Sequence, residues 1–392
     1  MQKDENIEQL LTRGVENVYP SKEALKNVLA SHKKLKIYYG IDPTGQLHLG
    51  HAIQLKKLRQ FQDMNHEIVI LIGDFTARIG DPTDKLATRQ QLSREQVEQN
   101  AKNYKQLIGK IMDMDRENIQ FVYNAEWNNA LKPEDLLNIA SNFTVSQLLE
   151  RDMYQQRLKA NKEIYLHEFL YPMFQAYDSV AMDVDMEIGG NDQTFNMLAG
   201  RTLVKRVKDK EKFVLTTKLL TDPTGKKMGK TEGNIIPLDA SANEMFGGVM
   251  SWPDEIIISG FELLTEVPKN EIEQMKTEMP DKLNPRDAKI RLAKEIVTCF
   301  WGSDEAEKAE KYFVETFSKG ETPADVKKFK PQNYDISSIL VESGLVESRS
   351  EARRVIEQGG VKLNGEVVRD FDAQVNPGAV LQKGKIFFLE IE

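Results

Sequence analysis

The sequence predicts an α/β fold with a parallel sheet in its first domain, followed by an α-helical domain and a small α+β domain. Two apolar runs, residues 37–41 and 68–73, read as buried strands, and residues 49–62 between them carry apolar side chains at helical spacing. A strand, a helix and a strand of this length form a βαβ unit, whose strands are parallel and whose ligands lie beyond the carboxyl ends of the strands. At 392 residues the chain also exceeds what one hydrophobic core organises, so we expect two or three domains.

The remaining elements follow in order along the chain. Residues 85–180 look mainly helical, a short strand at 186–188 resumes the sheet, and residues 221–235 form a loop rich in Gly, Lys and turn formers. Amphipathic helical patterns occupy 241–251, 269–279 and 285–317, before a Lys/Pro-rich linker. We therefore expect a first domain with a helical insertion near 121–165, a loop, a helical domain, a linker and a terminal domain, at residues 1–220, 221–235, 236–318, 319–334 and 335–392.

Composition and charge narrow the class of protein. An apolar fraction of 40% with 29% charged residues is that of a globular chain and not of a disordered one. The net charge of −8 means that any binding of nucleic acid depends on local clusters of cations. No signal-peptide pattern opens the sequence and no run of about 18 apolar residues occurs, so we expect a cytoplasmic protein outside the membrane. The one cysteine, Cys299, lies in an apolar run and is given no catalytic role.

Two histidines stand where the first predicted strand passes into its helix. His48 and His51 project to the same side of the first helical turn, beside unpaired backbone N–H groups and the positive end of the helix dipole. They form an anion site with imidazole donors, and Gly50 between them lets a nucleotide base or ribose approach the backbone. Taken alone, the pair is equally compatible with two surface histidines on a helix.

A second cationic element lies in the 221–235 loop. Lys227 and Lys230 are three residues apart, in positions suited to holding phosphates while charge moves during a reaction. Such a pair by itself is usually a solvated stretch of loop, so its meaning depends on the histidines that precede it.

Together, His48-Leu49-Gly50-His51 and Lys227-Met228-Gly229-Lys230-Thr231 resemble the His-Ile-Gly-His and Lys-Met-Ser-Lys-Ser signatures of class I aminoacyl-tRNA synthetases. Gly229 and Thr231 replace serines of the second signature, and Thr231 keeps a hydroxyl. From roughly residue 30 to the C-terminus, the chain most closely resembles the bacterial tyrosyl-tRNA synthetases. The resemblance implies a Rossmann-like catalytic domain, with catalytic roles for His48, His51, Lys227, Lys230 and Thr231.

Three residues on one face of a predicted helix point to the amino-acid pocket. Tyr171, Gln175 and Asp178 fall at i, i+4 and i+7, and by resemblance they line this pocket with Tyr38 at the end of the first strand. Asp178 and Tyr38 can hydrogen-bond a phenol hydroxyl, and phenylalanine would leave both groups unpaired. This family is itself a well-known example of such rejection.

The resemblance assigns further residues to the substrates. Asp81 holds the ammonium of tyrosine, for which a carboxylate is the simplest partner, and Gln193 contacts the amino acid. Lys85 and Arg89 form a cationic segment over the pyrophosphate and join the catalytic residues. Gly190 makes room for the ribose of ATP and Asp192 accepts from its hydroxyls. The implied ATP-binding set is Asp42, Thr44, Gly50, Gly190, Asp192 and Lys230.

Residues 335–392 resemble the S4 RNA-binding fold. Asn364-Gly365 signals a tight turn between short strands, and the candidate RNA-binding residues are Arg349, Arg353 and Arg354, the first two on one helix face. Seven Lys or Arg stand against ten Asp or Glu in this domain, so RNA can bind only through a localised patch. A small tail used for assembly is the alternative.

The mechanism implied by the resemblance has two steps. The tyrosine carboxylate attacks the α-phosphorus of ATP and pyrophosphate leaves, and a terminal ribose hydroxyl of tRNA(Tyr) then takes the tyrosyl group. Magnesium accompanies ATP, since the sequence shows no metal-ligand cluster, and no tightly bound cofactor is expected. The resemblance also implies a homodimer whose interface includes part of residues 121–165, with Val145, Leu148 and Leu149.

Three other functions compete with this one. A tryptophan-specific relative would share the fold and signatures but lack the pair Tyr38 and Asp178, and usually the S4-like unit. A non-enzymatic RNA-binding protein would have no need of intact His48, His51, Lys227, Lys230 and Gln193. A P-loop kinase is excluded because its Gly/Lys motif does not occur.

Overall fold

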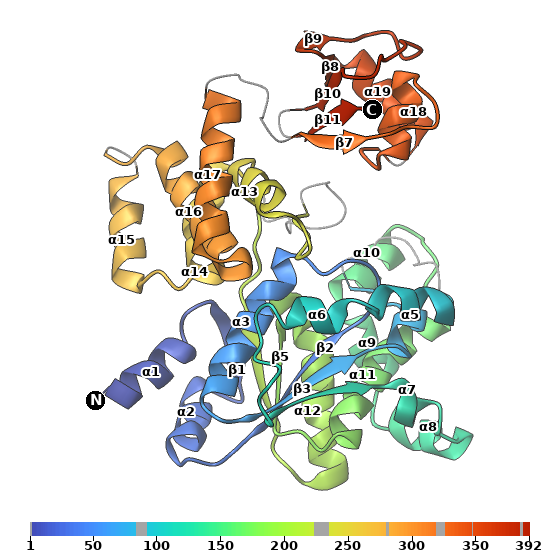
Figure 1. Ribbon diagram of the computed structural model, residues 1–392. Coiled ribbons are helices and arrows are strands. Elements are labelled where there is room, and N and C mark those ends of the chain that lie inside the picture. The colour runs from blue at the N-terminus through green and yellow to red at the C-terminus, as the bar shows by residue number, and fades with distance from the viewer. Residues whose placement is uncertain are drawn as a thin grey trace. The chain divides into compact units, whose positions relative to one another are not determined.

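The computed structural model describes residues 2–83, 92–222, 235–279, 282–318, 326–346, 348–384 and 387–392. Figure 1 shows the helices and strands of the chain. The chain divides into two units, of which the first comprises Met1–Asp239 and Trp252–Phe300 and the second Ala240–Ser251 and Trp301–Glu392. The helices of the predicted 236–318 domain are thus shared between the two units. In the described part of the chain, no helix is long and apolar enough to cross a membrane.

A six-stranded sheet with the order β1-β6-β5-β2-β3-β4 forms the centre of the first unit. The pairs from β6 through β4 are all parallel, as predicted, whereas the edge strand β1 pairs antiparallel with β6 and was not foreseen. The strands are β1 (Val15–Tyr19), β2 (Lys36–Ile41), β3 (Glu67–Ile72), β4 (Ile119–Tyr123), β5 (Met186–Gly190) and β6 (Phe213–Thr217). Because β2 has β5 on one side and β3 on the other, the strand order reverses between β2 and β5, which is where open parallel sheets bind ligands.

Helices connect and cover these strands. The first unit contains α1 (Gln2–Leu10), α2 (Lys22–Ala30), α3 (Leu49–Asp63), α4 (Thr76–Ile79), α5 (Arg94–Ala101), α6 (Tyr104–Ile108), α7 (Ala125–Asn128), α8 (Pro133–Ala140), α9 (Val145–Leu149), α10 (Asp152–Lys159), η1 (Leu166–Phe169), α11 (Leu170–Ala181), η2 (Asn191–Gln193), α12 (Thr194–Lys208), η3 (Asp254–Ile256), α14 (Ile257–Leu264) and α15 (Lys269–Glu278). Helix α16 (Pro285–Trp301) ends at the boundary between the units.

The predicted βαβ unit is confirmed as β2, α3 and β3. The apolar face predicted for this helix is buried, including Ala52, Leu58 and Phe61, and β2 and β3 pair in register along their whole length. The stretch 85–180, which we expected to be mainly helical, also contains β4. Its residues are only partly buried, so the segment lacks the continuous apolar run that identified β3.

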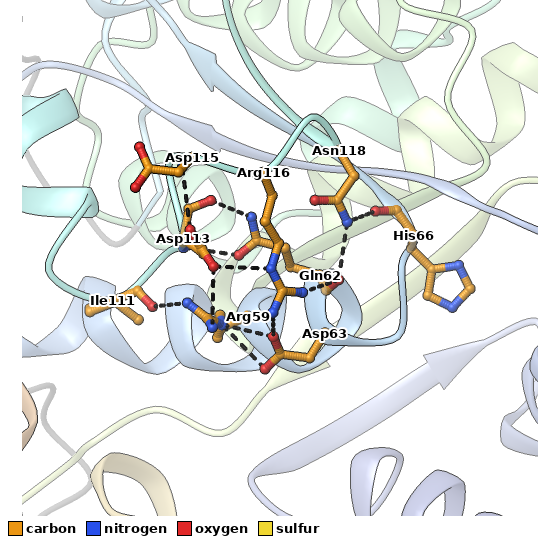
Figure 2. Close-up of polar contacts among 9 residues, drawn as sticks. All are labelled: Arg59, Gln62, Asp63, His66, Ile111, Asp113, Asp115, Arg116 and Asn118. Carbon is orange, nitrogen blue, oxygen red and sulfur yellow. Dashed lines mark hydrogen bonds and ion pairs between the residues drawn. The ribbon is translucent and has the colours of Figure 1, made fainter.

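A polar cluster fixes the chain ahead of β4 to the end of α3 (Figure 2). The guanidinium of Arg116 lies 2.9 Å from Asp63 and 3.0 Å from Asp113. Gln62 exchanges two hydrogen bonds with the backbone of Asp113, and Asn118 donates to the carbonyls of Gln62 and His66. The cluster lies at the amino end of β4, so it stabilises the sheet away from the ends of the strands that carry the candidate site.

The second unit contains two packed helices, α13 (Ala242–Met250) and α17 (Ser303–Ser318), and a small α+β domain. The pattern predicted at 285–317 is in fact two helices, α16 and α17, which break at Gly302 with a φ of 84°. The small domain has α18 (Ile336–Glu342), α19 (Arg349–Glu357) and a sheet of order β7-β11-β10-β8-β9, whose strands are β7 (Lys327–Phe329), β8 (Val361–Leu363), β9 (Glu366–Val367), β10 (Val380–Lys383) and β11 (Phe387–Ile391).

Two details of this small domain bear on the sequence predictions. Asn364 and Gly365 both have positive φ, 51° and 89°, which confirms the predicted tight turn between β8 and β9. The predicted linker 319–334, in contrast, contains β7, which pairs parallel with β11. Three residues at the edge of a sheet give too short a pattern to identify from sequence.

Candidate active site

A cavity of about 410 Å³ opens at the carboxyl ends of the parallel strands in the first unit. It lies where the strand order reverses, between residues that follow β2 and residues that follow β5. The structure brings together there the predicted residues Tyr38, Asp42, Thr44, His48, Gly50, His51, Asp81, Tyr171, Gln175, Asp178, Gly190, Asp192 and Gln193. Lys85, Arg89, Lys227, Lys230 and Thr231 lie outside the described residues.

His48 and His51 cap the N-terminus of α3. His48 is the N-cap residue, and its Nδ1 accepts from the backbone N–H of Gly50 at 3.1 Å, while Nδ1 of His51 accepts from the backbone N–H of His48 at 3.2 Å. Since both Nδ1 atoms accept, each neutral ring carries its proton on Nε2. The two imidazoles, with centroids 4.1 Å apart, therefore stand as N–H donors at the positive end of a helix dipole, a suitable place for phosphate.

Gly50 is required by the ring of His48. A β-carbon at Gly50 would lie 2.8 Å from Cε1 and 2.9 Å from Nδ1 of His48, so a larger residue would displace the capping imidazole. At Gly190 a β-carbon would meet Asp192 Oδ1 at 2.4 Å and Leu219 Cδ2 at 2.9 Å. Because glycine has no β-carbon, it leaves room at these two positions for the side chains of His48 and Asp192.

The segments on either side of the 223–234 stretch border the cavity. Leu219 and Leu220 line it, and the segment that begins at residue 235 runs beside His48. The backbone N–H of Leu49 donates to the carbonyl of Ile236 at 3.0 Å, and the N–H of Leu238 donates to the carbonyl of Leu47 at 2.9 Å. The segment that begins at residue 235 is thereby joined to the first signature through backbone hydrogen bonds.

Asp178 is buried at one end of the cavity and accepts three hydrogen bonds. Trp127 Nε1 donates to Oδ1 at 2.8 Å, Asn128 Nδ2 donates to Oδ1 at 3.3 Å, and Asn124 Nδ2 donates to Oδ2 at 3.1 Å. Burial raises the pKa of Asp178 to about 8, although the three donors oppose this shift. Tyr38, which the sequence pairs with Asp178, is hydrogen-bonded instead to Ser179, at 3.0 Å between the two hydroxyl oxygens.

A second carboxylate, Asp42, is held at the end of β2. The hydroxyl of Tyr171 donates to Asp42 Oδ2 at 2.8 Å, and the hydroxyl of Thr76 donates to Oδ1 at 2.7 Å. Burial, followed by the charge of Asp42, raises the pKa of Tyr171 well above its usual value. Tyr171 is therefore a neutral donor.

A third carboxylate, Asp81, is in contact with Gln193 at the cavity. Gln193 Nε2 donates to Asp81 Oδ2 at 2.7 Å, while the backbone N–H and hydroxyl of Thr83 donate to Oδ1 at 3.0 and 2.7 Å. The guanidinium of Arg151 lies 3.8 Å from the same Oδ1. Nearby, Gln175 Nε2 donates to Glu187, and Gln175 Oε1 is a buried acceptor with no partner among the residues described.

Sequence reasoning missed several residues of this site. Asn124 follows β4 directly at the carboxyl end of a parallel strand, and this position could have identified it. The sequence carried no such signal for Trp127, Asn128, Ser179, Arg151 and Lys212, because only tertiary packing brings them behind the residues that line the cavity.

In the small domain, two of the three predicted arginines have partners on their own domain. Arg349 donates to the Ser338 hydroxyl at 2.8 Å, and Arg353 pairs with Glu357 at 3.0 Å and stacks on Phe371. Arg354 is exposed.

The arrangement joins an anion-binding end to a polar pocket. Imidazole N–H groups and a helix terminus suit phosphates, and Asp192 beside Gly190 offers acceptors for ribose hydroxyls. Asp81 and Gln175 Oε1, which has no hydrogen-bond partner in the described part of the chain, suit an ammonium group. Asp178 and Tyr38 suit a hydroxyl group in the pocket.

The sequence matches known protein families along most of its length. Residues 30–318 match the family described as tRNA synthetases class I (W and Y), and residues 336–381 match the S4 domain. The chain is 44% identical to the tyrosine–tRNA ligase of Haemophilus ducreyi, with 97% of this chain and 96% of that protein covered. It is 42% identical to the tyrosine–tRNA ligase of Thermotoga maritima, with 95% and 94% covered.

Solved structures show the same fold. A truncated mitochondrial tyrosyl-tRNA synthetase of Coccidioides posadasii matches with a TM-score of 0.63 at 25% identity, covering 78% of this chain and 91% of that one. A tyrosyl-tRNA synthetase of Archaeoglobus fulgidus complexed with L-tyrosine matches with a TM-score of 0.61 at 21% identity, covering 79% and 100%.

Proposed function

This chain belongs to the tyrosyl-tRNA synthetase family of class I, with a C-terminal S4 domain, and we propose that it joins L-tyrosine to tRNA(Tyr) at the expense of ATP. The observation that carries the amino-acid specificity is the buried Asp178, held by three N–H donors opposite Tyr38. The phenol hydroxyl of a bound tyrosine both donates and accepts, so it can donate to the Asp178 carboxylate and accept from the Tyr38 hydroxyl. An indole N–H can only donate, which disfavours tryptophan.

In the first step the carboxylate oxygen of tyrosine attacks the α-phosphorus of ATP, and the bond to the bridging oxygen of pyrophosphate breaks. Asp81 and Gln175 Oε1 hold the ammonium, which places the carboxylate of tyrosine toward α3. The Nε2–H groups of His48 and His51 stabilise charge that develops on the phosphate oxygens. No side-chain nucleophile is needed.

In the second step a ribose hydroxyl of the tRNA attacks the activated carbonyl, and AMP leaves. Asp192 and Gly190, with Asp42 and Thr44, form the proposed site for the adenosine part. Lys85, Arg89, Lys227, Lys230 and Thr231 keep the roles over the phosphates that the resemblance implies. We propose that Mg²⁺ enters on the ATP phosphates; among the described residues, no group of three or more His, Cys, Asp or Glu side chains is placed to hold a metal.

We also propose that the S4 domain contacts the tRNA, with exposed Arg354 as the best placed of the three arginines.

A homodimer is proposed from the exposed apolar side chains between α8 and η1. Leu137 is 71% exposed, Val145 67% and Leu166 79%, whereas Leu148 is buried within the chain.

Amino-acid-dependent exchange of pyrophosphate into ATP tests the proposal. All twenty amino acids are assayed with the wild type and with Asp178→Asn, and we expect exchange with tyrosine alone, weakened in the variant. Exchange with tryptophan would keep the class and overturn the pocket assignment. An absence of exchange with every amino acid would favour a protein that binds RNA without catalysis.

A further inference from the structure

Behind the cavity wall lies a buried lysine that the reaction as described does not use. Lys212, immediately before β6, is fully buried and does not line the cavity. Its Nζ donates to the Ser179 hydroxyl at 2.7 Å, to the carbonyl of Met197 at 3.5 Å and to a carboxylate oxygen of Glu187. Three donors thus meet three acceptors, as a buried ammonium requires.

The backbone makes space for this lysine. A β-carbon at Gly200 on α12 would lie 2.6 Å from Lys212 Nζ and 2.9 Å from Ser179 Oγ. Burial lowers the pKa of Lys212, and the adjacent Glu187 opposes this by favouring the charged form. A buried ion pair often costs more in desolvation than it returns, so its presence beside a binding pocket points to a role other than stability.

Ser179 links the lysine to the pocket. Across the described ranges of the chain, the hydrogen bonds of the Ser179 hydroxyl run only to Lys212 and to Tyr38. An ammonium can only donate, so the Ser179 oxygen accepts from Lys212, and the Ser179 hydrogen is left to donate to Tyr38 Oη. Burial, and then the charge of Glu187 and a hydrogen bond to its carboxylate, raises the pKa of Tyr38 well above its usual value. Tyr38 therefore keeps its own proton, for which the oxygen of a bound substrate competes with Glu187.

We propose that Lys212 is a positioning residue which, through Ser179, fixes Tyr38 as a hydrogen-bond donor into the amino-acid pocket. The inference rests on the proposed function. The chain of donors runs from Lys212 to Ser179, to Tyr38, to the phenol oxygen of the substrate, whose own hydrogen goes to the acceptor Asp178. Lys212 at one end can only donate and the Asp178 carboxylate at the other end can only accept, so all hydrogen bonds of the chain point the same way. An amino acid without a hydroxyl group cannot bridge Tyr38 and Asp178.

Glu187, the ion-pair partner of Lys212, also contacts the amino-acid pocket through Gln175. Its second carboxylate oxygen accepts from Gln175 Nε2 at 3.0 Å, which turns Gln175 Oε1 away as a free acceptor among the described residues. The same ion pair therefore orients a group proposed for the phenol and a group proposed for the ammonium.

The test compares three variants of the full-length chain, Lys212→Met, Ser179→Ala and the double variant, by tyrosine-dependent pyrophosphate exchange. We expect each single change to raise KM for tyrosine about tenfold while KM for ATP stays the same, because one oriented hydrogen bond is weakened. Exchange with phenylalanine should decrease less than exchange with tyrosine, so the ratio of the two activities becomes smaller. The double variant should resemble either single one, since both changes interrupt the same chain.

Asn118→Ala is the matched structural control. Asn118 binds two backbone carbonyls in the polar cluster of Figure 2, so its loss should lower the melting temperature without raising KM for tyrosine. If Lys212→Met fails to fold, Ser179→Ala carries the test, because it leaves Lys212 and Glu187 paired.

Variants that lower the melting temperature but leave KM for tyrosine unchanged would overturn the inference and leave the proposed function intact. Additive effects in the double variant would also overturn it. An absence of tyrosine-dependent exchange in the wild type would overturn the proposed function, and this inference with it.

Discussion

The indole Nε1 of Trp127 lies 2.8 Å from Oδ1 of Asp178, so a side chain from the short helix α7 holds the carboxylate of α11. Asn124 and Asn128 donate to the same carboxylate. A carboxylate has roughly four acceptor positions, and three are therefore occupied, which leaves one for a ligand.

Replacement of Trp127 by Phe removes the shortest of these three donors. We expect KM for tyrosine to rise about tenfold, because Asp178 loses a bond that favours its charged form and fixes its orientation. KM for ATP should not change. Pyrophosphate exchange measures both constants, and an equal change in the two would contradict a role confined to Asp178.

The raised pKa of Asp178 predicts how tyrosine binding depends on pH. A pKa of about 8 means that the carboxyl group of the ligand-free protein is protonated below this pH, whereas a phenol hydroxyl needs the ionised acceptor. Binding should therefore improve as the pH rises, with KM for tyrosine falling up to about tenfold per unit between about pH 6 and about pH 8. Asp178→Asn should flatten this profile, and a wild-type KM that is constant over the range would contradict the assignment.

Gly50→Ala places a methyl group within 2.9 Å of the His48 ring. The imidazole must then leave its capping position and lose the hydrogen bond from Gly50. We expect kcat to fall about 100-fold, as when one donor to a developing negative charge is removed, with little change in KM for tyrosine. Single-turnover formation of the adenylate measures the step. A variant that retains wild-type kcat would show that the cap does not fix the catalytic imidazole.

The exposed apolar side chains between α8 and η1 predict self-association. Leu166→Asp introduces a charge at a side chain that is 79% exposed in the single chain, so it should convert a dimer to a monomer in sedimentation at micromolar concentration. Val207→Asp is the control, because Val207 is 57% exposed but lies on α12, outside the stretch from α8 to η1. A wild-type monomer, or equal effects of the two changes, would rule out this interface.

Part of the central sheet was predictable from sequence. β2, β3 and the helix between them form continuous apolar patterns, and the expected boundaries differ from the observed ones by a residue. β1, β4 and β7 were not predicted because each is short and lies at the edge of its sheet, where side chains face solvent. β6 was not predicted either, although all of its residues are buried.

The candidate site divides in the same way. His48 was predicted from its place in the first turn of a helix after a strand, and Asp192 from its resemblance to a family motif at the end of a strand. Trp127 and Lys212 were not, because their significance comes from a contact made across the tertiary structure. The sequence gives the type of residue at these two positions, but not the side chains that it contacts in the folded chain.

The reciprocal cap at the start of α3 also decides how an inactive form of the protein should be made. Alanine at position 48 would remove the N-cap side chain along with the imidazole, so lost activity would be mixed with fraying of the helix. Asparagine is among the best N-cap residues, and its side-chain oxygen can accept from Gly50 much as Nδ1 does now. His48→Asn therefore removes the catalytic imidazole but keeps a side chain that caps the helix. It is the appropriate inactive variant for trapping bound substrates.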